Sequence, residues 1–352
     1  MSNTQYLEPE LRLLEGNRVC WLLATAILPV LLLAIAVGPV SFSLGEILNN
    51  ESTQSMLILR EIRIPRALLS ALVGAVLAIS GAVMQGLFRN PLADPSLIGV
   101  SAGASVGASI AILAGGYMAE ALGGWLSVST LSGLSLISIG AFIGGAGAVV
   151  LVYRLSTSPY HGTSVATMLL VGIAISALAA ALNNLMSFMA SNEMLRRMSL
   201  WQMGNLDLAN WNRVWLCMAM LGLFLALLRG QASSLNAMLL GESEARHLGV
   251  NVQTMKRRII LLAALGVGVS TALAGTIAFV GLIVPHIVRL ISGPDHRSLL
   301  LASGLLGAIL LMLADLIARL VIAPAELPVG VITAFLGVPF FIYLLRQTKS
   351  AR

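Results

Sequence analysis

Residues 67–88 read ALLSALVGAVLAISGAVMQGLF, a run of apolar and small side chains without a single charged residue. About 20 such residues are what an α-helix needs to cross the hydrocarbon core of a bilayer. Backbone groups in hydrocarbon must be hydrogen-bonded internally, and strands of a membrane barrel would alternate polar and apolar residues. The stretch therefore predicts a membrane-spanning helix, and similar runs along the chain predict an all-α integral membrane protein.

Composition supports a single polytopic membrane domain over residues 1–352. Hydrophobic residues make up 58% of the chain and charged residues only 10%, against about 25% charged in globular domains. Ten spanning helices are expected, at approximately 19–40, 67–88, 96–114, 134–153, 167–190, 215–228, 259–280, 284–291, 298–321 and 329–345. The polar stretch 229–258 is expected to be a loop.

The charged residues predict the orientation. Residues 1–18 carry Glu8, Glu10 and Glu15, unlike a signal peptide, and are expected to form a cytoplasmic tail. With the N-terminus in the cytoplasm, seven of the 21 basic residues lie outside and the other 14 inside. This distribution agrees with the enrichment of Lys and Arg in cytoplasmic loops. The seven are Arg60, Arg63, Arg66, Arg196, Arg197, Arg213 and Arg319. Ten helices also bring the C-terminus inside, so both termini are predicted to be cytoplasmic.

A faint internal repeat relates the second to fifth helices to the seventh to tenth. Arg66-Ala-Leu-Leu-Ser-Ala-Leu-Val-Gly resembles Arg258-Ile-Ile-Leu-Leu-Ala-Ala-Leu-Gly. The first copy begins outside and the second inside, which is typical of an inverted repeat.

The usual sites of covalent chemistry are missing from the sequence. Its two lysines, Lys256 and Lys349, lie outside any phosphate-binding loop pattern. Cys20 and Cys217 form no metal-binding motif, and His286 and His296 lack a third ligand at suitable spacing. The chain is therefore predicted to be neither an enzyme nor a metal protein, and to bind no cofactor.

Asp315 is the only carboxylate deep in a predicted helix, four residues before Arg319. This spacing predicts an ion pair on one helical face. An ion-coupled carrier would be expected to bury several ionisable groups along its path. The pattern therefore weighs against a carrier, which remains an alternative together with a structural subunit that has no pathway.

Three motifs carry a resemblance to a known family. They are Arg63-Ile-Pro-Arg66, the string NPLADPSLIGVSAGA at residues 90–104, and Gly241-Glu-Ser-Glu-Ala-Arg-His-Leu-Gly249. Together they resemble permeases of binding-protein-dependent ABC importers for iron-siderophores, heme and cobalamin. The resemblance runs from Arg60 to Leu345 and implies the type II permease fold in a bacterial inner membrane.

The resemblance also implies partners and site residues. Two copies of the chain would form the pore, with two separate ATPase subunits that bind Mg-ATP and a periplasmic substrate-binding protein. The ATPase would dock on residues 229–258, chiefly on Leu240, Gly241, Glu242, Ala245, Leu248 and Gly249. A helix there would turn Leu239, Leu240 and Ala245 towards it. Exposed Arg63, Arg66 and Arg319 would receive glutamates of the binding protein, and Asn90, Leu92, Thr163 and Ser164 would narrow the cytoplasmic exit.

The substrate depends on the external stretch after the fifth helix. The pattern Leu-Arg-x-x-x-x-Trp-x-Met-Gly-x-Leu, which begins at Leu195 and contains Trp201, looks most like the heme permeases of the family. Arg196 and Arg197 could face heme propionates. Five methionines could form a soft apolar wall for a porphyrin, namely Met186, Met189, Met194, Met198 and Met203. Ferric siderophores and cobalamin remain the alternatives.

Overall fold

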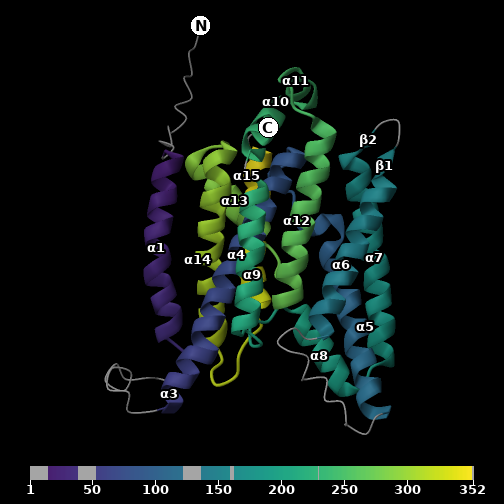
Figure 1. The fold of residues 1–352 in the computed structure, drawn as a ribbon, viewed down its shortest axis with the longest axis vertical. Coiled ribbons are helices and arrows are strands. Elements are labelled where there is room, and N and C mark those ends of the chain that lie inside the picture. Colours follow the sequence, from purple (N-terminus) through teal and green to yellow (C-terminus); the bar gives the residue numbers. More distant parts are fainter. Residues whose placement is uncertain (1–14, 39–52, 122–135, 159–161, 229, 351–352) are drawn as a thin grey trace.

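The chain folds as a bundle of long helices that run roughly side by side (Figure 1). The computed structural model describes residues 15–38, 53–121, 136–158, 162–228 and 230–350. The expected tail, residues 1–18, lies mostly outside this part. Within it, eight helices are long and apolar enough to cross a membrane.

The expected helices are all present. The eight long ones are α1 (Gly16–Ala36), α4 (Ile64–Phe88), α5 (Val100–Ala121), α6 (Leu136–Ser156), α7 (Val165–Met189), α9 (Trp211–Leu228), α12 (Val252–Ala274) and α14 (His296–Leu320). Apolar stretches in α13 (Val280–Ser292) and α15 (Val329–Ser350) are shorter. These two correspond to the eighth and tenth expected helices, so the predicted order of ten is confirmed.

The polar stretch 229–258, expected to be a loop that could contain a helix, is largely helical in its described residues. It contains α10 (Gln231–Leu240), α11 (Glu242–His247) and the first turns of α12. Helix α12 begins at Val252 because the side chain of Asn251 accepts a hydrogen bond from the N–H of Thr254 and caps it. The seventh helix therefore begins seven residues earlier than hydropathy predicts.

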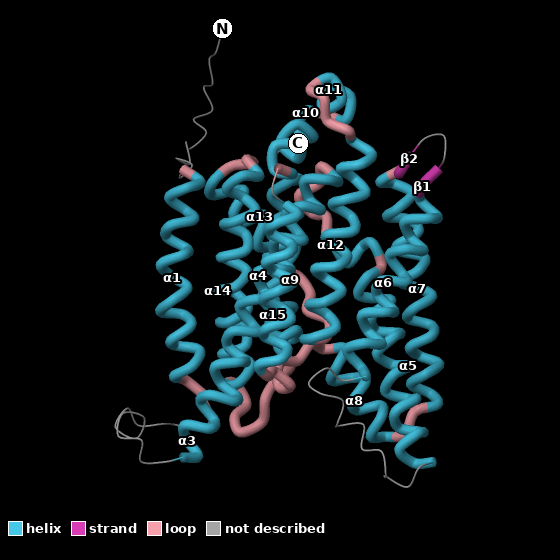
Figure 2. The backbone as a smooth tube through the Cα atoms, in the orientation of Figure 1, coloured by secondary structure: helices cyan, strands magenta, loops and turns pink. Residues whose placement is uncertain are grey.

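Short elements lie at the two ends of the bundle (Figure 2). One end carries α10, α11 and a hairpin of β1 (Thr157–Ser158) and antiparallel β2 (Gly162–Thr163). The other end carries α3 (Thr53–Ile58) and α8 (Asn192–Gln202). A π-helical turn, Leu59–Arg63, joins α3 to α4, and a 3-10 turn, Pro95–Ile98, precedes α5.

The relative directions of the helices fit the inverted repeat. The start of α1 and the end of α15 lie at the α10–α11 end. Helix α4 starts from the α3 end, whereas α12 starts from the α11 end (Figure 1). The two halves thus begin at opposite ends of the bundle, as the repeat predicts.

Helix α4 forms the centre of the bundle, where small residues permit close packing. Most of its residues are buried, and it packs against α9, α12, α13 and α14. A Cβ atom at Gly81 would collide with the backbone carbonyl of Gly281 on α13, and one at Gly74 with that of Gly307 on α14. Such contacts between small residues let membrane helices approach closely.

Gly81→Ala is expected to destabilise the protein, whereas Gly222→Ala is not. The alanine at position 81 must push α4 away from α13, and over-packing of this kind costs about 1–3 kcal/mol. Gly222 has no atom within 4 Å of an added Cβ. Thermal unfolding of both variants in one detergent checks this. Equal unfolding temperatures would contradict the tight α4–α13 contact.

Candidate functional site

The segment α10–α11 projects from one end of the bundle (Figure 1). Gly241, with φ of 124°, separates the two helices, and Gly249, with φ of 83°, follows α11. Residues other than glycine rarely adopt these backbone angles. Leu240 is 66% exposed and Leu248 is 63% exposed. The sharp turns thus present two large apolar side chains at the tip of the molecule.

Ala245 does not face outward, contrary to expectation. Its side chain is completely buried, and its carbonyl accepts a hydrogen bond of 2.9 Å from the N–H of Val250. Leu239 is 40% exposed and lies on the accessible side as predicted. Ala245 instead packs into the main hydrophobic core, which holds α11 against the body of the protein.

Polar side chains fasten α10 to the start of α14. Asn236 donates a 2.6 Å hydrogen bond to Asp295, and its carbonyl accepts one of 2.9 Å from the N–H of His296. The N–H of Arg297 and the Asn236 amide both donate to Asp295, and these bonds lower the pKa of its carboxyl. Near neutral pH the Asp295 carboxylate is therefore charged, and it holds α10 to the start of α14 through Asn236.

Three of the four expected gate residues, Asn90, Leu92 and Ser164, take part in a local turn or a helix cap. Asn90 is exposed, and its side-chain oxygen accepts a 2.9 Å hydrogen bond from the N–H of Leu92. Ser164 caps α7 by accepting a hydrogen bond from the N–H of Thr167, while Thr163 is buried in β2. In the described part of the chain, no hydrogen bond joins the Asn90–Leu92 turn to Thr163–Ser164.

At the opposite end, Arg66 forms the centre of a cluster of ion pairs. Its guanidinium lies 2.9 Å from Asp315 on α14, 2.7 Å from Glu326 and 3.4 Å from Asp207. Arg319 lies 3.1 Å from the second oxygen of Asp315, which confirms the predicted pair. Arginine suits such sites because its planar fork can bind several carboxylate oxygens at once.

Arginines of the same cluster cap the C-terminal end of α1. Arg63 donates to the carbonyls of Ile35 and Ala36, at 3.2 and 2.9 Å, and Arg319 donates to that of Ala34 at 3.0 Å. The last carbonyls of a helix have no partner within the helix and carry its negative dipole end. The arginines therefore connect α1 to α4 and α14.

All three arginines are buried, so the expectation that they are exposed at helix mouths is wrong for the isolated chain. Arg63 is 4%, Arg66 is 7% and Arg319 is 3% exposed. The accessible side of the cluster consists of its carboxylates, with side chains 29% exposed at Glu326 and 46% at Asp207. Sequence reasoning missed both acids, because each lies in a loop outside the helices that carry the arginines. Asp207 is also far from all three arginines in sequence, whereas Glu326 follows Arg319 by seven residues.

The five methionines near α8 do not form one wall. Met194 and Met198 lie on the buried face of α8 and pack with Ile112, whereas Met189 and Met203 are 57% and 45% exposed. Met186 lies partly buried beside the buried pair. The outer face of α8 carries Arg196 and Arg197, and Arg197 pairs with Glu193 at 2.5 Å. The accessible face of α8 therefore has a net positive charge, because Glu193 pairs with Arg197 and leaves Arg196 without a carboxylate partner among the described residues.

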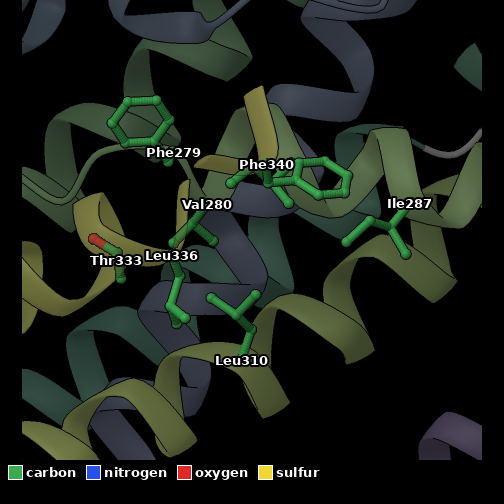
Figure 3. Close-up of a pocket in the computed structure, with 8 residues that line it drawn as sticks. Phe279, Val280, Ile287, Leu310, Thr333, Leu336 and Phe340 are labelled. Carbon is green, nitrogen blue, oxygen red and sulfur yellow. The ribbon is translucent and has the colours of Figure 1, made fainter. Parts of the chain in front are cut away.

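A cavity of about 210 Å³ opens between α13, α14 and α15 (Figure 3). Its lining is apolar apart from Thr333, and the rings of Phe279 and Phe340 border it. Leu336 lines it and is also 52% exposed on α15.

Comparison with known proteins identifies the family. The sequence profile of the FecCD transport family matches residues 25–347. The chain belongs to the FecCD transport family. It is 41% identical over 318 residues to the hemin transport system permease protein HmuU of Yersinia pestis, covering 90% of this chain and 91% of that protein.

Other relatives carry different substrates in their names. The chain is 40% identical over 340 residues to the vitamin B12 import system permease protein BtuC of Salmonella typhi, covering 96% of this chain and 98% of the relative. A solved structure of a metal-chelate type ABC transporter in an inward-facing conformation superposes with a TM-score of 0.81 and 30% identity, covering 94% of this chain and 99% of that one.

Membership of the FecCD family establishes the general role of the chain. It is a multi-pass inner-membrane permease subunit of an ABC importer. A separate ATPase subunit carries out ATP hydrolysis.

Proposed function

We propose that this FecCD permease imports heme from the periplasm to the cytoplasm. The observation that carries the proposal is the exposed cationic face of α8, in the stretch that resembles heme permeases. Heme is an apolar ring with two carboxylates, and arginines bind carboxylates through charge-assisted hydrogen bonds. The similarity to a hemin permease supports the same substrate.

Cobalamin is the second candidate, because the vitamin B12 permease matches a larger share of the chain. The ring substituents of cobalamin are amides rather than free carboxylates. A cationic α8 face should therefore matter less for cobalamin than for heme, which makes the two substrates separable by experiment. Ferric siderophores remain a third class within the family.

The proposed orientation puts α10–α11 in the cytoplasm and α3 and α8 in the periplasm. The basic residues support it, because Arg246, Lys256, Arg257 and Arg258 all belong to α11 or the first turns of α12. Cytoplasmic loops are enriched in such residues. Two copies of the chain would enclose the pathway, with two ATPase subunits below them.

The ATPase is proposed to dock on the exposed Leu240 and Leu248. The periplasmic binding protein is proposed to dock over Arg63, Arg66 and Arg319. Because these arginines are neutralised internally, an incoming glutamate would meet Glu326 and Asp207 first. Docking would then exchange an internal carboxylate for an external one.

Arg196→Ala is expected to slow heme uptake about tenfold, the effect of losing a contact of about 1.5 kcal/mol to a charged group. Arg197→Ala is the matched control, because Arg197 already pairs with Glu193, whereas Arg196 has no ion pair within the described part of the chain. The measurement is ATP-driven uptake by liposomes that contain the permease and ATPase, with the binding protein outside. Cobalamin uptake serves as a parallel assay. Heme uptake unaffected by Arg196→Ala would refute a contact between Arg196 and a propionate. ATPase stimulation by cobalamin but not by heme would refute heme as the substrate.

A further inference from the structure

Lys256 is a buried cation at the end of the molecule that carries α11. Its side chain is only 4% exposed, although it lies in the second turn of α12. Removing an ammonium group from water is costly unless polar partners replace the water. The partners of Lys256 therefore show which segments depend on it.

The ammonium group of Lys256 joins two segments that are distant in sequence. Its Nζ lies 2.6 Å from Oε1 of Glu242, the first residue of α11. It also donates a 3.3 Å hydrogen bond to the backbone carbonyl of Thr163, the last residue of β2. One side chain thus connects the exposed α11 with the hairpin that precedes α7.

Gln253 makes a second hydrogen bond between α12 and Thr163. Its side-chain oxygen accepts a 3.2 Å hydrogen bond from the Thr163 N–H. Gln253 and Lys256 are three residues apart, so they lie on one face of α12. Both backbone polar groups of Thr163 are therefore held by α12, and the next residue, Ser164, caps α7.

We propose that Lys256 and Gln253 form a clamp that transmits movement of α11 to the first turn of α7. The proposal rests on the proposed docking of the ATPase on α10–α11, and it is independent of the substrate. A shift of α11 would move Glu242, the ion pair would carry Lys256, and the hydrogen bonds to Thr163 would move the start of α7. Lys256 is thus a positioning residue that couples the ATPase to the start of α7.

Contacts alone do not demonstrate energetic coupling, which requires an element that responds at one site to an event at another. Ala166, exposed in the first turn of α7, offers a place for such a reporter. Ala166→Cys, introduced after Cys20→Ser and Cys217→Ala, can be labelled with a maleimide in the complex with the ATPase. The labelling rate is compared without nucleotide and with Mg-ATP plus vanadate.

The clamp predicts that nucleotide changes the labelling rate at position 166 and that Lys256→Met abolishes this change. Methionine retains an unbranched apolar stem in the buried site. Arg257→Met is the matched control, because Arg257 is the adjacent cation and is exposed. Gln253→Leu is expected to reduce the change partly, and since Gln253 is exposed this variant should fold in any case.

Several outcomes would overturn the clamp. One is a labelling rate in the parent that nucleotide does not change. Another is a nucleotide effect on the labelling rate in Lys256→Met that is as large as in the parent. If Lys256→Met does not fold, an undiminished nucleotide effect in Gln253→Leu has the same meaning. A parent complex that fails to retain the ATPase would refute the docking proposal and the clamp together. No heme is present, so an error in the proposed substrate leaves the result unaffected.

Discussion

Replacing Asp315 with alanine is expected to abolish accumulation of folded permease. Asp315 is 1% exposed and pairs with both Arg66 and Arg319. Without it, two buried guanidinium groups lose the carboxylate between them. Breaking one buried pair in this way costs about 3–5 kcal/mol. The measurement is the yield of monodisperse protein after size-exclusion chromatography in detergent, followed by thermal unfolding.

Asp207→Asn provides the control for Asp315→Ala. Asp207 belongs to the same cluster, but its side chain is 46% exposed and lies 3.4 Å from Arg66. Solvent screens such a pair, so its loss should cost at most about 1 kcal/mol. If the Asp315 variant were as abundant and stable as the parent, Glu326 and the α1 carbonyls would suffice for the arginines. The central role assigned to Asp315 would then be wrong.

The second large effect is expected at the tip of the molecule. Leu240→Asp combined with Leu248→Asp should abolish import by preventing the ATPase from binding. Both side chains are more than 60% exposed, so folding should be retained. A carboxylate buried in an apolar contact without a partner is strongly unfavourable, and a few central side chains usually dominate such interfaces. Co-purification with the tagged ATPase measures the effect.

Leu208→Asp is the matched control for this pair. Leu208 is 62% exposed and lies before α9, so the whole length of that spanning helix separates it from α10–α11. It should leave ATPase binding unchanged while placing a carboxylate on a similarly exposed leucine. Normal retention of the ATPase by the Leu240–Leu248 double variant would exclude these leucines from the interface.

The sequence predicted the order of the helices well, because long apolar runs have few alternatives in a membrane. It failed at the start of α12, where Lys256, Arg257 and Arg258 interrupt the apolar pattern. Hydropathy treats these charges as a loop. In the structure, Lys256 is buried by specific partners and the two arginines are exposed on the same helix.

The site was predicted less completely, because burial depends on partners that a motif does not contain. The three arginines were identified from their motifs, yet their burial follows from Asp207, Glu326 and the end of α1. Met194 and Met198 likewise face inward because α8 is amphipathic, which a count of methionines does not reveal. Contacts between segments distant in sequence decided both cases.

The central claim is that this chain is a passive pathway driven by a separate ATPase bound to α10–α11. Uptake of labelled heme and cobalamin into liposomes tests it most directly, with the permease present alone or together with its ATPase and binding protein. We predict that the chain alone accumulates neither compound under a proton or sodium gradient, and that ATP drives accumulation in the complete system. Accumulation against a gradient by the chain alone would contradict the account.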